Sequence, residues 1–87
     1  MNSNLSLFLS QDEALVLFEV LARFQETDKL SLINNAEFIA LSRVSAQLDK
    51  LLVAPFDPNY LNLLAEARTR LSEGYEGQAP GVEPAET

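Results

Sequence analysis

The stretch that decides the fold is residues 10–26, SQDEALVLFEVLARFQE. It begins at Ser10 and places Glu13 three positions later, which is the capping-box pattern of a helix start. On a helical wheel of about 100° per residue, the charged side chains share one narrow arc and nearly everything else is apolar. An ordinary surface helix needs an apolar stripe only somewhat wider than about 100°. We therefore expect a helix over 11–26 that is covered from more than one side.

A second helix is predicted over 35–53. Asn34 is a favourable N-cap residue, and Glu37 stands three positions after it, so the start signal of the first helix is repeated. Leucine and valine then recur at helical spacing on one face of this segment, whereas polar side chains occupy the other. The pattern is typical of a helix that packs against a core.

The segment APFDP at 54–58 separates this helix from a third one. Pro55 disfavours helix at the residue before it, and Asp57 places a capping carboxylate ahead of Pro58. These signals predict a helix over 58–73, with the following glycine as its stop. The sequence thus predicts an all-α, compact three-helix domain over residues 1–73.

Both ends of the chain carry less regular signals. Leucines alternate with other residues over 5–9, and a similar run occurs at 30–33. Either the two runs pair as short strands, or they are extended connections that place leucines on the core; we favour the second. Residues 74–87 are rich in glycine, proline and glutamate, so we expect a disordered acidic tail.

Composition excludes most catalytic chemistry. The 87 residues include no histidine and no cysteine, so the commonest general base, metal ligand and thiol nucleophile are absent. The acidic residues of the first helix, Asp12, Glu19 and Glu26, recur on one face, but Arg23 stands at ion-pair spacing from two of them. We expect a solvated stripe there. The prediction is a non-enzymatic protein with no catalytic residues, no cofactor site and no metal site.

The charge balance limits the class of partner. Six basic and thirteen acidic side chains give a net charge of −7, which argues against direct binding of nucleic acid. No run of apolar residues approaches the roughly 18 needed to span a bilayer. The N-terminus lacks the basic residues of a signal peptide. We expect a cytoplasmic protein that does not associate with membranes.

The apolar arc of the first helix is wider than the surface that the other two predicted helices are expected to cover. Val16, Val20 and Phe24 lie at the edge of that arc, and we take them as candidates for a homodimer or partner contact. Their alternative role is in the core, covered by the N-terminal segment or by the connection at 27–33. Phe56 and Tyr60 flank the proline turn and are the aromatic pair that we expect to stay partly exposed as a partner anchor.

Three segments carry a resemblance: residues 12–19 (DEALVLFE), 54–60 (APFDPNY) and 64–68 (LAEAR). They resemble a group of small bacterial helical proteins whose function is not established, and the similarity covers about residues 5–73. The resemblance implies a bacterial source and a compact helical fold. It carries over no active site.

The sequence favours a protein-binding module, of the kind found among immunity proteins, antitoxins and inhibitors, that acts on a basic protein partner. That comparison rests on small size and acidity alone. The alternative is a structural protein that self-associates through the apolar face of the first helix.

Overall fold

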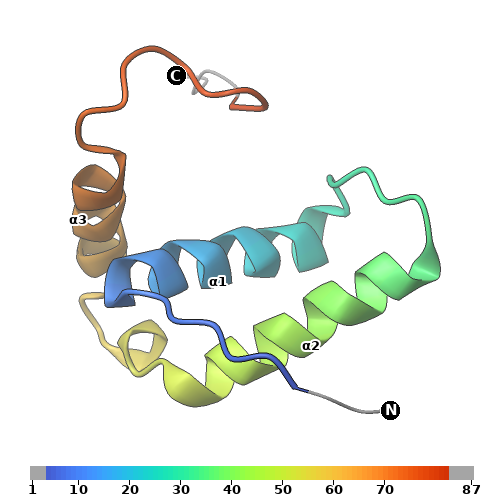
Figure 1. Cartoon of the computed structure of the whole chain (residues 1–87). Coiled ribbons are helices and arrows are strands. Elements are labelled where there is room, and N and C mark those ends of the chain that lie inside the picture. Colours follow the sequence, from blue (N-terminus) through green and yellow to red (C-terminus); the bar gives the residue numbers. More distant parts are fainter. Residues whose placement is uncertain (1–3, 83–87) are drawn as a thin grey trace.

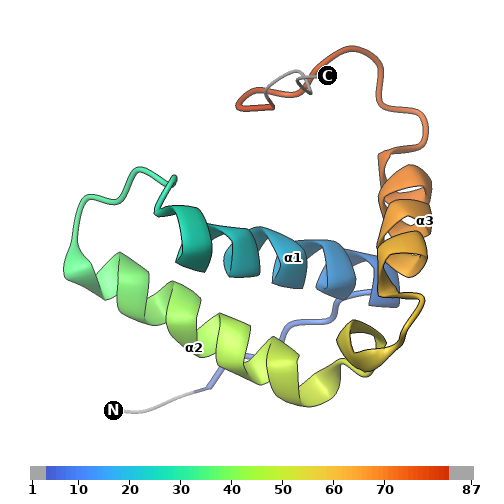
Figure 2. The same cartoon turned by 180° about the vertical axis from the view of Figure 1, so that it is seen from behind.

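The computed structural model describes residues 4–82, which contain three α-helices and one short 3-10 turn. The elements are α1 (Gln11–Thr27), α2 (Asn35–Leu51), η1 (Ala54–Phe56) and α3 (Tyr60–Ser72). α1 and α2 run side by side in opposite directions, and α3 stands across the end of this hairpin where α1 begins (Figure 1). The view from behind shows the same arrangement (Figure 2). The all-α prediction is confirmed, and residues 4–82 contain no strand.

The start of α1 has the predicted capping box. The backbone N–H of Glu13 donates to Ser10 Oγ at 3.0 Å, and the backbone N–H of Ser10 donates to Glu13 Oε1 at 2.8 Å. Two N–H groups that a helix start leaves without partners are thereby satisfied. α1 ends at Asp28, whose backbone adopts the left-handed conformation with φ 56° and donates to Phe24 O.

The start of α2 differs slightly from the predicted box. Asn34 Oδ1 accepts from the backbone N–H of Ala36, as expected of a cap. Glu37 reaches one residue further back than in a capping box, because its carboxylate accepts from the N–H of Ile33 at 2.7 Å. The acidic side chain still stabilises the first turn through the helix dipole.

The predicted bounds around the proline break were wrong by two residues on each side. α2 ends at Leu51, because Leu52 is extended, with φ −92° and ψ 133°. α3 begins at Tyr60 with Asn59 in the cap position, so Pro58 precedes the helix. The Asp57 carboxylate accepts from the N–H of Asn59 at 2.7 Å, which closes a turn before the helix.

Neither leucine run forms a strand, and the first run does not place all its leucines on the core, because Leu5 and Leu7 are 96% and 79% exposed. Residues 4–10 and 28–34 contain no strand, so the paired-strand alternative does not hold for them. We call residues 4–9 the N-terminal arm. The arm leaves the start of α1 and runs past the C-terminal half of α2 (Figure 1). Beyond α3 the chain continues through turns without a helix as far as residue 82, and the predicted tail beyond that point lies outside the described residues, as do residues 1–3.

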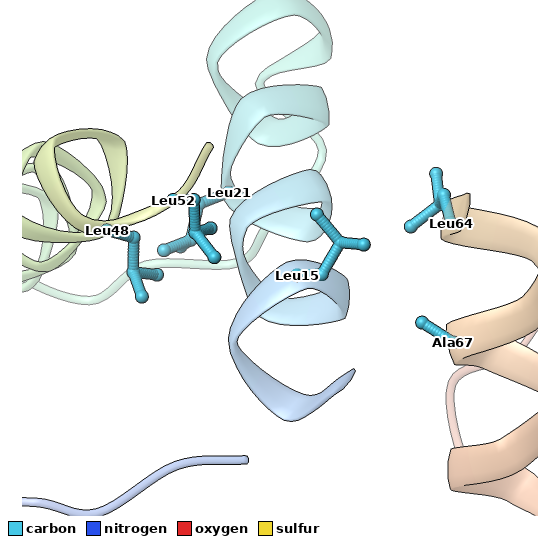
Figure 3. Close-up of a cluster of buried hydrophobic side chains, with 6 residues drawn as sticks. All are labelled: Leu15, Leu21, Leu48, Leu52, Leu64 and Ala67. Atoms are coloured by element: carbon cyan, nitrogen blue, oxygen red, sulfur yellow. The ribbon is translucent and has the colours of Figure 1, made fainter. Parts of the chain in front are cut away.

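The core lies on two sides of α1 (Figure 3). On one side Leu15 points toward Leu64 and Ala67 of α3. On the opposite side of α1, Leu21 of α1 lies near Leu48 of α2 and Leu52, the residue after α2. The expectation that the first helix is covered from more than one side is therefore confirmed: α1 is the element that packs against both other helices.

Two leucines of α3 allow a matched test of this core. Leu64 is almost fully buried, whereas Leu61 is 77% exposed on the same helix. Leu64→Ala leaves a cavity between α3 and α1 and is expected to lower the free energy of unfolding by about 2–4 kcal/mol. Leu61→Ala removes the same atoms from solvent-exposed surface and should change it by less than about 0.5 kcal/mol. Urea unfolding followed by circular dichroism measures both, and equal effects would contradict this core.

Candidate functional site

The most exposed apolar side chains of the helical body gather where α2 passes into α3. We call Leu51, Val53, Phe56 and Leu61 the apolar corner; each is between 75% and 80% exposed. Leu51 is the last residue of α2 and Leu61 lies in the first turn of α3. Val53 precedes η1, and Phe56 is the last residue of η1. These are the exposed apolar side chains around the α2–α3 link, and exposed apolar surface of this kind is where interaction sites are sought.

Successive turns hold the corner in place. The N–H of Phe56 donates to Val53 O at 3.0 Å, and the N–H of Asp57 donates to Ala54 O at 2.9 Å. Pro55 occupies the start of η1, where its missing N–H and fixed φ cost nothing. η1 packs against α3. The corner therefore has a defined backbone, which lowers the entropy that a partner would have to remove on binding.

An ion pair between α1 and α3 fixes the position of α3. Arg70 Nε donates to Asp12 Oδ2 at 2.8 Å, and Arg70 Nη2 donates to Asp12 Oδ1 at 2.9 Å. This two-bond geometry is the most directional form of a guanidinium–carboxylate pair. The hydrogen bonds from Arg70 lower the pKa of Asp12, and those to Asp12 raise the pKa of Arg70.

A second polar contact joins the same two helices. The Tyr60 hydroxyl donates to Glu19 Oε1 at 2.7 Å, next to the corner. Two effects raise the pKa of Tyr60 to about 12: the larger is partial burial of the phenol, and the smaller is this hydrogen bond to a carboxylate. The predicted solvated stripe was therefore wrong for Asp12 and Glu19, because both side chains face α3. The local partner suggested by the spacing, Arg23, forms no ion pair among the described residues.

The three candidate interface residues of α1 have different surroundings. Val16 is partly buried and lines a groove beside α3. Phe24 is partly buried and packs edge-to-face on Phe38 of α2, with ring centroids 6.3 Å apart. Val20 is 38% exposed. Two of the three thus already have partners within the chain, and their role in an interface stays a prediction.

Phe56 and Tyr60 also differ from each other. Phe56 belongs to the corner, whereas Tyr60 is partly buried against the core and hydrogen bonded to Glu19. Sequence reasoning did not single out the other corner residues, since Leu51 and Leu61 follow the helical spacing of core leucines. The signal that could have found them is the group of apolar residues on both sides of the proline-containing break.

The described surface offers little for catalysis. Within residues 4–82, no three acidic side chains come together in a way that could hold a metal ion. A hollow of about 730 Å³ lies between α3, Val16 of α1 and residues 75–82. Apolar side chains line most of it, and Arg68 is its one charged residue. This hollow therefore presents a mainly apolar surface.

Comparison with known proteins yields no relative: no family model, curated protein or solved structure matches the chain. None of the helices in the described part of the chain is long and apolar enough to cross a bilayer. The functional interpretation therefore depends on the surface itself.

The Tyr60–Glu19 contact predicts how stability responds to alkaline pH. Unfolded tyrosine ionises near pH 10, but the folded state holds the proton up to about pH 12. The folded state binds more protons over this interval, so the stability that this contact provides is present below pH 10 and falls as the pH rises toward 12. We expect the urea midpoint of the wild type to fall more steeply between pH 9 and 11 than that of Tyr60→Phe. Parallel slopes would contradict the raised pKa.

Proposed function

We propose that the protein is a non-enzymatic binding module, of the immunity-protein, antitoxin or inhibitor type, that engages a protein partner through the apolar corner. The observation that carries the proposal is the exposure of Leu51, Val53, Phe56 and Leu61 on a backbone fixed by turns. Burying such residues against a partner releases the water that they now order. Aromatic side chains at the centre of an apolar patch are frequent hot spots, so Phe56 is the expected anchor.

The charge of the chain supports a basic partner. Thirteen acidic side chains against six basic ones leave a net charge of −7, which accelerates encounters with a positively charged surface. Asp49 and Asp57 stand next to the corner in the sequence, with Lys50 as the single nearby base. An apolar centre with an acidic surround would combine hydrophobic affinity with electrostatic steering.

The absence of histidine and cysteine supports a binder over an enzyme, because the usual general base and nucleophile are missing from the chain. Self-association through the α1 face is less well supported than the corner. Val16 and Phe24 are partly buried within the chain, which leaves Val20 as the exposed member of that trio.

A substitution in the corner tests the proposal. The partner is first captured from a lysate of the source organism, identified by mass spectrometry and purified. Phe56→Asp places an uncompensated charge at the expected anchor and should weaken binding about 30-fold or more, measured by isothermal titration calorimetry. The association rate of the wild type should also fall with rising salt.

Two variants serve as controls for that measurement. Ile33→Asp makes the same kind of change at a residue that is 92% exposed in the α1–α2 connection, at the end of the hairpin away from α3 (Figure 1). It should bind like the wild type. Val20→Asp should also bind normally, because the α1 face is not the proposed contact. Wild-type affinity of Phe56→Asp would overturn the proposal. So would a loss of affinity in Val20→Asp that is as large as the loss expected for Phe56→Asp.

A further inference from the structure

The N-terminal arm has the features of an unpaired β-strand. Within residues 4–82, no backbone hydrogen bond involves residues 4–9. The capping box fixes Ser10 in an extended conformation, so the arm leaves α1 from a defined point. Three of its side chains, Leu5, Leu7 and Phe8, are between 79% and 96% exposed. An extended backbone with free N–H and C=O groups is a template for strand pairing.

The arm also lacks the features by which proteins protect such an edge. No charged side chain occurs before Asp12, and residues 4–9 contain neither proline nor glycine. Proteins usually block strand pairing with charge, proline or a bulge. Acidic side chains elsewhere on the protein would repel a second copy. Residues 4–9 contain none, so this repulsion is absent at the arm itself.

The order of residues in the arm is self-complementary. In an antiparallel pair of arms centred on Leu7, Leu7 faces its own symmetry mate and Leu5 faces Leu9 of the other copy. Ser6 then faces Phe8. Because side chains alternate between the two faces of a strand, all leucines fall on one face of the ribbon and the serine–phenylalanine pairs on the other.

The body of the protein provides a surface for that leucine face. Leu7, Phe8 and Leu9 line a hollow of about 280 Å³. Its other apolar lining residues are Ala14 of α1, Leu48 and Leu51 of α2, and Leu52 just after α2. A cavity of about 150 Å³ already holds a benzene molecule, so there is space for an added leucine side chain. The pairing above brings Leu5 of the second copy next to Leu9, at the edge of this hollow.

We propose that the arm pairs with the arm of a second copy of this chain, as a two-stranded antiparallel ribbon centred on Leu7 that lies over the hollows of both copies. The contact is isologous, as expected of a twofold dimer. A two-stranded ribbon alone is marginal in water, and packing of its leucines on the two helical bodies supplies the rest. Two six-residue arms bury on the order of 1,200 Å² together, which is the lower range for a specific interface.

This dimer does not depend on the proposed function. It uses the arm, and it leaves Val53, Phe56 and Leu61 of the corner free for another protein. Leu51 of the corner lines the hollow beneath the arm, so the two surfaces meet at that residue. Loss of dimerisation would leave Val53, Phe56 and Leu61 unaffected, and Phe56→Asp does not touch the paired strands. The two proposals can therefore fail separately.

Single-cysteine variants test the register, because the chain has no cysteine of its own. Leu7→Cys places two thiols opposite each other across the twofold axis, within reach of a disulfide. Under a mild oxidant, this variant should form a covalent dimer at least tenfold faster than Ile33→Cys, a control outside the arm whose residue is even more exposed, at 92% against 79% for Leu7. Non-reducing electrophoresis measures the rates, and circular dichroism checks that each variant is helical.

Two further variants distinguish the possible pairings. Leu5→Cys alone should crosslink slowly, because four residues of strand, about 13 Å, separate it from its own symmetry mate. A mixture of Leu5→Cys and Leu9→Cys chains should crosslink rapidly. Sedimentation equilibrium of the unmodified chain should show a concentration-dependent dimer.

Three results would overturn the proposal. Leu7→Cys could crosslink no faster than Ile33→Cys, which would leave the arm without a second copy. Leu5→Cys alone could crosslink as fast as Leu7→Cys, which indicates parallel pairing. The unmodified chain could also sediment as a monomer at millimolar concentration, as expected if the arm pairs with the sheet edge of a different protein.

Discussion

The structure depends on the packing of α1 against two different helices. Leu15 meets Leu64 and Ala67 on one side, and the cluster with Leu48 and Leu52 lies on the other. Because α1 packs against both α2 and α3, its two apolar sides determine where those two helices lie. α3 consequently stands across the end of the hairpin instead of lying along it (Figure 1). In the link between α2 and α3, Leu52 is buried in the core, whereas Val53 and Phe56 are exposed and belong to the apolar corner.

The small core explains why so much apolar surface is exposed. Each helix buries only two residues, although an amphipathic helix of about seventeen residues usually turns roughly a third of them inward. Polar contacts fix the α1–α3 orientation in addition to apolar burial: the Asp12–Arg70 pair and the Tyr60–Glu19 hydrogen bond. The orientation of α3 relative to α1 is thus defined, while the side chains of the corner and of the N-terminal arm remain exposed to solvent. The backbone turns of the corner hold its exposed apolar groups in defined positions.

Local signals in the sequence predicted the helices well. The capping box at Ser10 and Glu13 and the breadth of the apolar arc both correspond to observed contacts. The proline break was predicted with the wrong bounds, because the carboxylate of Asp57 serves the turn before α3 rather than the helix itself.

The candidate site was less predictable, for a physical reason. Arg70 is 58 residues from Asp12, so the spacing on α1 suggested Arg23 as the partner and only the tertiary fold brings Arg70 close. Leu51 and Leu61 have core-like helical spacing, and their exposure follows from where α3 stands. Periodicity reports which face of a helix is apolar, but it does not report which other element covers that face.

The fold leaves the apolar corner open to solvent, whereas Leu15 of α1 and Leu64 of α3 are buried in the core. Paramagnetic relaxation of methyl NMR signals by a soluble gadolinium chelate tests this most directly, because the effect depends on how closely water-borne probes approach each methyl group. The account predicts strong relaxation for Leu51, Val53 and Leu61, comparable to that of Ile33, and weak relaxation for Leu15 and Leu64. Corner methyls that are as protected as those of Leu64 would contradict it.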